Sequence, residues 1–176
     1  MKAIIIGPQH SCTRLFTAII DRHPDIEYAE HWSVPSGTQD NYQFPIYKNP
    51  NTEEPETYDK ILVVNRDSNA IDLSCLRDNI EIFLDDESKN QSYKTKSFII
   101  DSINNLSESD REKLTIASFE NLVTYKEVYL RQLFTTMGLD PNTYDYNLTG
   151  RYTFDPPRWF TVNLDLVDTN RKYLKL

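Results

Sequence analysis

The residues with the clearest chemical potential lie in one short stretch near the amino terminus, from Gly7 to Arg14 (GPQHSCTR). A β-branched run precedes this stretch and a helical pattern follows it, so the sequence predicts a tight turn that leads into a helix. Backbone N–H groups and the helix dipole stabilise an anion at such a helix N-terminus. His10, Ser11, Thr13 and Arg14 add further hydrogen-bond donors. Taken alone, the pattern fits phosphate binding and a helix merely capped by Ser and Thr equally well.

Other chemistries are less well supported by the same residue types. The turn contains no Lys, whereas a Walker A loop needs a second Gly followed by Lys and Ser or Thr. Hydrolysis of ATP or GTP is therefore disfavoured. The histidines and cysteines show no metal-ligand spacing, so we expect no metal site; they are His10, His23, His31, Cys12 and Cys75.

Short apolar runs that alternate with helical patterns predict the elements that position this turn. We expect buried strands at 2–6, 60–65 and 114–118, with a shorter one at 26–29, and helices at 11–22, 68–83, 97–106 and 126–137. Strands that alternate with helices form parallel βαβ units. The sequence therefore predicts an α/β fold with three layers, in which helices flank a central, mainly parallel sheet.

The length of 176 residues suits a single domain, 1–176. Within it, 33–59 reads as an irregular insertion or lid, 85–96 as a loop and 147–176 as an irregular C-terminal segment. The net charge of −8 disfavours nucleic acid and anionic membrane surfaces as partners. No apolar run approaches the roughly 18 residues of a membrane span, and no secretory leader is recognisable, so we expect a cytoplasmic protein.

The segment IIIGPQHSCTRLFTAIIDRHPDI resembles the opening of the sulfotransferase family, in which a strand, Gly-Pro, a Ser-Gly-Thr-Thr loop, a helix and His-Pro follow one another. Ser11 and Thr13 match that loop. His10 stands where the family has Lys or Arg, Cys12 replaces Gly, and Arg14 replaces the second Thr, although the heparan-type branch also has Thr-Arg. The resemblance implies a P-loop NTPase-like fold in which these residues hold the 5′-phosphosulfate of 3′-phosphoadenosine 5′-phosphosulfate (PAPS).

Two later segments are similar to further motifs of that family. VVNRDSNAIDLS resembles its 3′-phosphate motif, which implies that Arg66 and Ser74 bind this phosphate. A guanidinium can bind phosphate bidentately, and a helix Ser can donate its hydroxyl. LTIASFENLVTYKEVYLRQLFTTMGLDP resembles the late strand, turn and long helix of the family.

The resemblance also implies a general base after the second strand, where this sequence has Glu30 and His31. Adjacent residues of a strand point to opposite faces, so we expect one of the two to reach the site. The heparan-type branch uses Glu, which favours Glu30, whereas His31 has an ordinary pKa near 6.5 that suits a base at neutral pH. A protonated His10 would aid catalysis in place of the family's Lys or Arg.

The expected function is transfer of a sulfuryl group from PAPS to a hydroxyl or amine of a small-molecule or saccharide acceptor, with no metal. The acidic net charge disfavours a polyanionic acceptor. Two alternatives remain: a non-catalytic nucleotide-binding descendant of the fold, which His10 and Cys12 favour, and a small-molecule kinase of the P-loop type, which the missing Lys disfavours. The sequence carries no signal for an oligomeric state.

Overall fold

A computed structural model of the chain describes residues 1–34, 58–68, 71, 91–146, 149–152 and 158–161, of which 91–94, 149–152 and 158–161 are described by their backbone alone. The larger part of the expected lid, most of the expected helix 68–83, Ser74 and much of the C-terminal segment lie outside the described residues.

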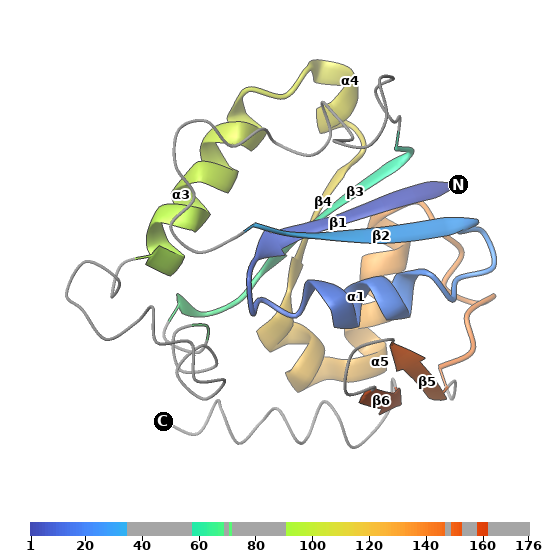
Figure 1. Ribbon diagram of the computed structural model, residues 1–176. Helices are drawn as coiled ribbons and strands as arrows, with labels where there is room; N and C mark the ends of the chain where they lie inside the picture. The colour runs from blue at the N-terminus through green and yellow to red at the C-terminus, as the bar shows by residue number, and fades with distance from the viewer. Residues whose placement is uncertain (35–57, 69–70, 72–90, 147–148, 153–157, 162–176) are drawn as a thin grey trace.

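The centre of the molecule is a four-stranded sheet in the order β2-β1-β3-β4, in which every neighbouring pair is parallel (Figure 1). The strands span β1 Lys2–Pro8, β2 Tyr28–Val34, β3 Lys60–Asn65 and β4 Leu114–Ser118. β1 is buried along almost its whole length, as expected for an apolar run covered on both faces.

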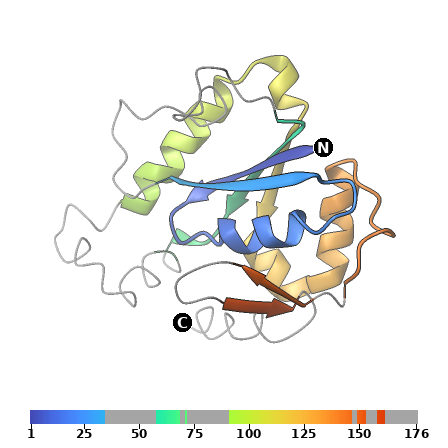
Figure 2. The same ribbon diagram turned by 45° about the vertical axis from the view of Figure 1, so that its right-hand side comes forward.

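Helices cover both faces of this sheet (Figures 1 and 2). Ala3 and Ile5 of β1 pack with α1 (Thr13–Ile20) and α5 (Phe119–Thr136) on one face. Ile4 and Ile6 pack on the other face with Ile99 of α3 (Gln91–Asn104). A short helix, α4 (Glu108–Arg111), begins at the N-cap Ser107 and precedes β4. The predicted three-layer α/β fold is confirmed.

The strand order has a consequence for where a ligand binds. From β1 the chain crosses through α1 to β2, and from β3 it reaches β4 on the opposite side of the sheet through α3. Because such crossovers are right-handed, opposite directions put α1 and α3 on opposite faces. Ligands of open α/β sheets bind outside the carboxyl ends of the strands where the order reverses. Here that place lies between the ends of β1 and β3.

Several element boundaries differ from the sequence prediction. The second strand runs through Val34 instead of ending at residue 29, so the first two residues of the expected lid belong to the sheet. α3 begins at Gln91, within the expected loop 85–96. The helix expected from Lys126 begins at Phe119, and the backbone is kinked at Lys126, whose φ of 49° is non-helical. These boundaries depend on how each element packs against the sheet, which local composition does not show.

The C-terminal segment is not irregular throughout. β5 (Thr149–Tyr152) and β6 (Arg158–Thr161) pair as antiparallel strands outside the main sheet. This pair lies beside α1 and α5, with β5 in contact with α1 (Figure 2). Short strands in an aromatic, Pro-containing stretch have weak sequence signals, since pairing and packing stabilise them.

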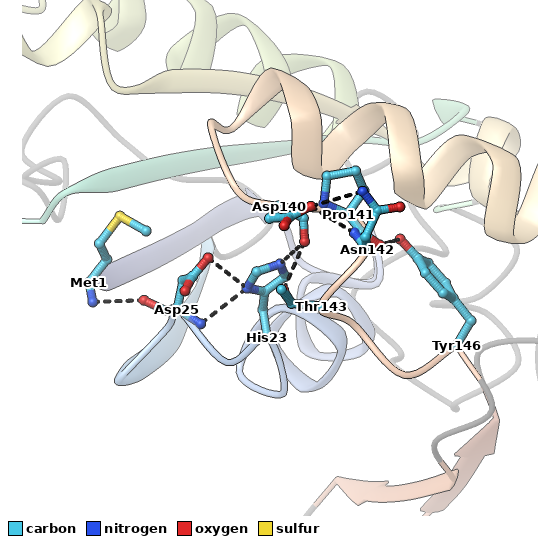
Figure 3. Close-up of polar contacts among 8 residues, drawn as sticks. All are labelled: Met1, His23, Asp25, Asp140, Pro141, Asn142, Thr143 and Tyr146. Carbon is cyan, nitrogen blue, oxygen red and sulfur yellow. Dashed lines mark hydrogen bonds and ion pairs between the residues drawn. The ribbon is translucent and has the colours of Figure 1, made fainter.

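His23 joins elements at the amino edge of the sheet (Figure 3). Its side chain is buried, with Nε2 lying 3.0 Å from the carbonyl oxygen of Asp140, and Nδ1 accepts a hydrogen bond of 3.2 Å from the backbone N–H of Asp25. Because Nδ1 is an acceptor, Nε2 carries the proton and donates to Asp140. The ring also packs against Phe134 of α5. His23 thus connects the end of α1 to the segment after α5. Its place before Pro24 suggests a capping or a surface residue, and the structure shows it buried, with Nδ1 accepting from a backbone N–H just beyond the helix.

Candidate functional site

The predicted turn lies between β1 and α1 and passes close to the end of β3. Gly7 is needed there, since a Cβ would lie 2.9 Å from Cγ2 of Thr13 and 3.0 Å from the carbonyl oxygen of Val64, and would meet Oγ of Ser11. His10 and Cys12 have φ of 65° and 71°, in the left-handed region that favours glycine. The family's Gly at the position of Cys12 would adopt this conformation at lower cost.

Cys12 is the N-cap residue of α1, but its side chain caps no backbone N–H. The opening N–H groups of a helix have no intrahelical acceptor and point toward a ligand or water. The turn itself is held by hydrogen bonds from the N–H of Gln9 to Val34 and from the N–H of Ser11 to Pro8. The predicted donor Thr13 is engaged internally, with its hydroxyl 2.9 Å from that of Ser33. The helix N-terminus, more than the Thr13 hydroxyl, is therefore what the turn offers an anion.

Arg66 lies directly against the turn. Its Nη1 donates a hydrogen bond of 2.8 Å to the carbonyl oxygen of His10 and lies 3.6 Å from Sγ of Cys12. The side chain is 3% exposed, and the guanidinium carbon is 4.5 Å from the centre of the Phe119 ring. The resemblance predicts that the turn and Arg66 bind two different phosphates of one nucleotide. In the structure the two are in direct contact through Nη1 of Arg66, which leaves other N–H groups of the guanidinium, Nε–H among them, to meet a phosphate.

Residues from two other elements hold this arrangement together. Phe119 is buried beneath the guanidinium, and Oε1 of Glu120 accepts a hydrogen bond of 2.8 Å from the backbone N–H of Asp67. Lys96 of α3 donates a hydrogen bond to the carbonyl oxygen of Arg66. The FENL motif of the late segment was the available signal for Phe119 and Glu120. No pattern in the sequence indicates Lys96, because its position depends on how α3 packs.

Buried polar atoms at the turn include Oγ of Ser11 and Nε of Arg66, which have no hydrogen-bond partner among the residues that the structure describes. Ser11 is fully buried and Arg66 nearly so. Buried polar groups are nearly always paired, because an unpaired one costs free energy. Together with the uncapped end of α1, these atoms mark the turn as a place where a polar ligand or ordered water completes the structure.

Glu30 and His31 lie on opposite faces of the sheet. Glu30 is level with Ile4 of β1 and accepts hydrogen bonds from the hydroxyls of Tyr28 and Tyr58. His31 is level with Ile5, on the face covered by α1. Of the two residues, His31 is therefore the one on the same face as α1, and Glu30, which the resemblance favours as a base, is not.

His31 contacts the first turn of α1. The Nε–H group of Arg14 donates to Nε2 of His31 over 3.2 Å. Burial lowers the pKa of His31 below its ordinary value, and the positive charge of Arg14 lowers it further, against the opposing effect of the Glu30 carboxylate. His31 is therefore neutral at pH 7, with its proton on Nδ1 and the lone pair of Nε2 directed at Arg14.

The structure thus gathers His10, Ser11, Cys12, Thr13 and Arg14 in one turn, with Arg66 against it and His31 beside Arg14. Glu30 lies away from this group, and Ser74 lies outside the described residues.

Among the described residues, no cluster of His, Cys, Asp and Glu side chains could hold a metal ion. Likewise, none of the helices described is both long and apolar enough to cross a membrane.

Comparisons with protein-family models, with curated proteins and with solved structures found no match for this chain.

Proposed function

We propose that the chain binds PAPS at the β1–α1 turn and transfers its sulfuryl group to a hydroxyl or amine of a small-molecule or saccharide acceptor. The observation that carries the proposal is the meeting of the uncapped α1 N-terminus with buried Arg66 between the carboxyl ends of β1 and β3. This is where open α/β sheets bind ligands, and helix N-termini with a guanidinium suit phosphate and sulfate.

In the proposed sulfuryl transfer, each group of residues has a separate role. The acceptor oxygen or nitrogen attacks sulfur, the bond from sulfur to the bridging oxygen breaks, and its electron pair leaves with 3′-phosphoadenosine 5′-phosphate. Backbone N–H groups of the turn and His10 stabilise the charge that develops on the transferred group and the leaving oxygen, while Arg66 binds the 3′-phosphate. His31 takes the acceptor's proton at Nε2, a role for which it must be neutral.

Binding is tested by thermal unfolding with 3′-phosphoadenosine 5′-phosphate. We expect stabilisation of about 2.7 kcal/mol at a concentration one hundred times the dissociation constant, and weaker binding of adenosine 5′-phosphate. Arg66→Met should lower the affinity about 10- to 100-fold, because hydrogen bonds to charged groups contribute about 1.5–3 kcal/mol. Absence of stabilisation by the saturating nucleotide would refute the proposal.

Arg131→Met is a matched control for Arg66→Met. The guanidinium carbon of Arg131 lies 4.3 Å from the centre of the Tyr146 ring, much as Arg66 lies over Phe119. The control removes the same charge and the same kind of ring contact from another part of the molecule, so it should leave nucleotide affinity unchanged. Equal losses in both variants would show that Arg66 acts through stability or net charge alone.

A second candidate is nucleotide binding without transfer. The bond between Arg14 and Nε2 of His31, and the placement of Glu30 on the opposite face, favour it because neither base has an available lone pair near the turn. This candidate is distinguished by nucleotide binding with no sulfuryl transfer from PAPS across a broad panel of hydroxyl and amine acceptors. Preference for ATP with Mg²⁺ over the 3′-phosphorylated nucleotide would instead favour a kinase.

A further inference from the structure

Arg14 lies between the proposed anion site at the turn and the candidate base His31. It is exposed, and it lies in the first turn of α1, two positions after the N-cap Cys12, where an anion at the turn would bind. Its Nε–H group donates to Nε2 of His31 on β2. One flexible side chain therefore adjoins both the anion site and the candidate base.

Nε2 of His31 is a weaker acceptor for Arg14 than a bound anion would be. A neutral imidazole nitrogen carries no net charge, whereas phosphate and sulfate oxygens form charge-assisted hydrogen bonds with guanidinium that are roughly twice as strong. Guanidinium also fits these anions through two parallel N–H groups. An anion at the α1 N-terminus would therefore compete successfully for Arg14.

We propose that Arg14 gates His31: an anion bound at the turn draws the Arg14 guanidinium from Nε2 of His31 and makes that nitrogen available to accept a proton. The inference rests on the proposed function. It adds the order of events, because PAPS must bind before His31 can accept the proton of the acceptor. It also explains how His31 acts as the base although, in the structure, its Nε2 lone pair accepts a hydrogen bond from Arg14.

The electrostatic surroundings of His31 fix the direction of the effect. Arg14 from α1 holds its pKa down, the Glu30 carboxylate on the same strand holds it up, and the neighbouring β1 residue in register, Ile5, is uncharged. Removal of the guanidinium and arrival of a negative charge both favour the imidazolium. Anion binding should therefore raise the pKa of His31 and cause proton uptake at a pH near or below about 6.5.

The test is NMR titration of the histidine side chains in the full chain, with and without 3′-phosphoadenosine 5′-phosphate. The chain has three histidines, so His31→Gln identifies the signal, and buried His23 serves as an internal reference. In the ligand-free protein, the imidazole nitrogen shifts should report the tautomer protonated at Nδ1. The nucleotide should raise the pKa of His31 by about one unit.

Arg14→Gln should raise the pKa of His31 before any ligand is added, and the nucleotide should then raise it by less than in the parent protein. Arg22→Gln is the matched control, because Arg22 donates to the carbonyl oxygen of Ala18 near the other end of α1; it should behave as the parent protein.

Shifts of the turn amides without a change in the pKa of His31 would overturn the gate and leave the proposed function standing. An unchanged pKa in ligand-free Arg14→Gln would also overturn it, and no nucleotide binding at all would overturn both proposals.

Discussion

Gly7→Ala tests whether the turn is packed as tightly as its geometry indicates. The added Cβ would lie 2.9 Å from Cγ2 of Thr13 and 3.0 Å from the carbonyl oxygen of Val64, where relaxed contacts of carbon are about 3.5–4.0 Å. The Val64 backbone belongs to β3, which pairs with β1 and β4. It therefore cannot retreat without disturbing the sheet.

The expected cost of Gly7→Ala follows from these contacts. Overpacking of a tight site costs about 3 kcal/mol, and replacing Gly by Ala returns about 1 kcal/mol through the unfolded chain. We expect a net loss of about 2 kcal/mol, measured as the free energy of unfolding in urea. Because the turn must shift, nucleotide affinity should fall as well. A loss below about 0.5 kcal/mol would refute the steric argument.

A second substitution separates this clash from a general effect of alanine. Thr13→Ser removes Cγ2 and keeps the hydroxyl that contacts Ser33, so in the double variant it should recover about 1 kcal/mol of the loss. Gly138→Ala is the control, since Gly138 has a φ of 71° and, among the described residues, its Cβ would meet Nζ of Lys60 at 3.4 Å and nothing closer. Its cost of about 1–2 kcal/mol comes from backbone strain, and Thr13→Ser should not reduce it.

Two further substitutions test other features. Cys12→Gly should change the free energy of unfolding by less than about 1 kcal/mol. Relief of the strain at a φ of 71°, about 1–2 kcal/mol, is offset by the greater freedom of Gly in the unfolded chain and by loss of the contact between Sγ and Arg66. Urea denaturation checks this, and a loss above about 2 kcal/mol would contradict the strain. Tyr144→Phe should stabilise by about 0.5–1 kcal/mol at pH 7, because the buried Tyr144 hydroxyl has no hydrogen-bond partner among the described residues. Burial raises the pKa of Tyr144 above its ordinary value, because the folded protein favours the neutral phenol. The folded state therefore keeps its full stability below about pH 10, and its free energy of unfolding falls as the pH rises further. Urea denaturation at pH 7 and pH 11 should show a smaller alkaline loss in Tyr144→Phe, and equal losses would show that another group titrates.

Local patterns predicted the strands and the turn because these features depend on neighbouring residues. The β-branched run before Gly7 is apolar throughout, and β1 is buried on both faces. Local sequence also sets the start of α4, since Ser107 accepts from the N–H of Asp110 three residues later. By contrast, the first half of α5 was missed. Its buried residues Phe119, Leu122 and Val123 keep the helical spacing of Leu130, Leu133 and Phe134, but a backbone kink at Lys126 separates the two halves.

The sequence by itself determined the alternation of strands and helices and the Gly-containing turn with its donors, because short-range periodicity and residue type carry this information. Glu30 and His31 were candidate bases only through the resemblance. Only the tertiary structure decided which of the two shares a face with α1, and that Arg66 bonds to the turn over a Phe119 ring. These contacts join residues tens of positions apart. Their geometry depends on strand order and helix packing, and no local pattern encodes either.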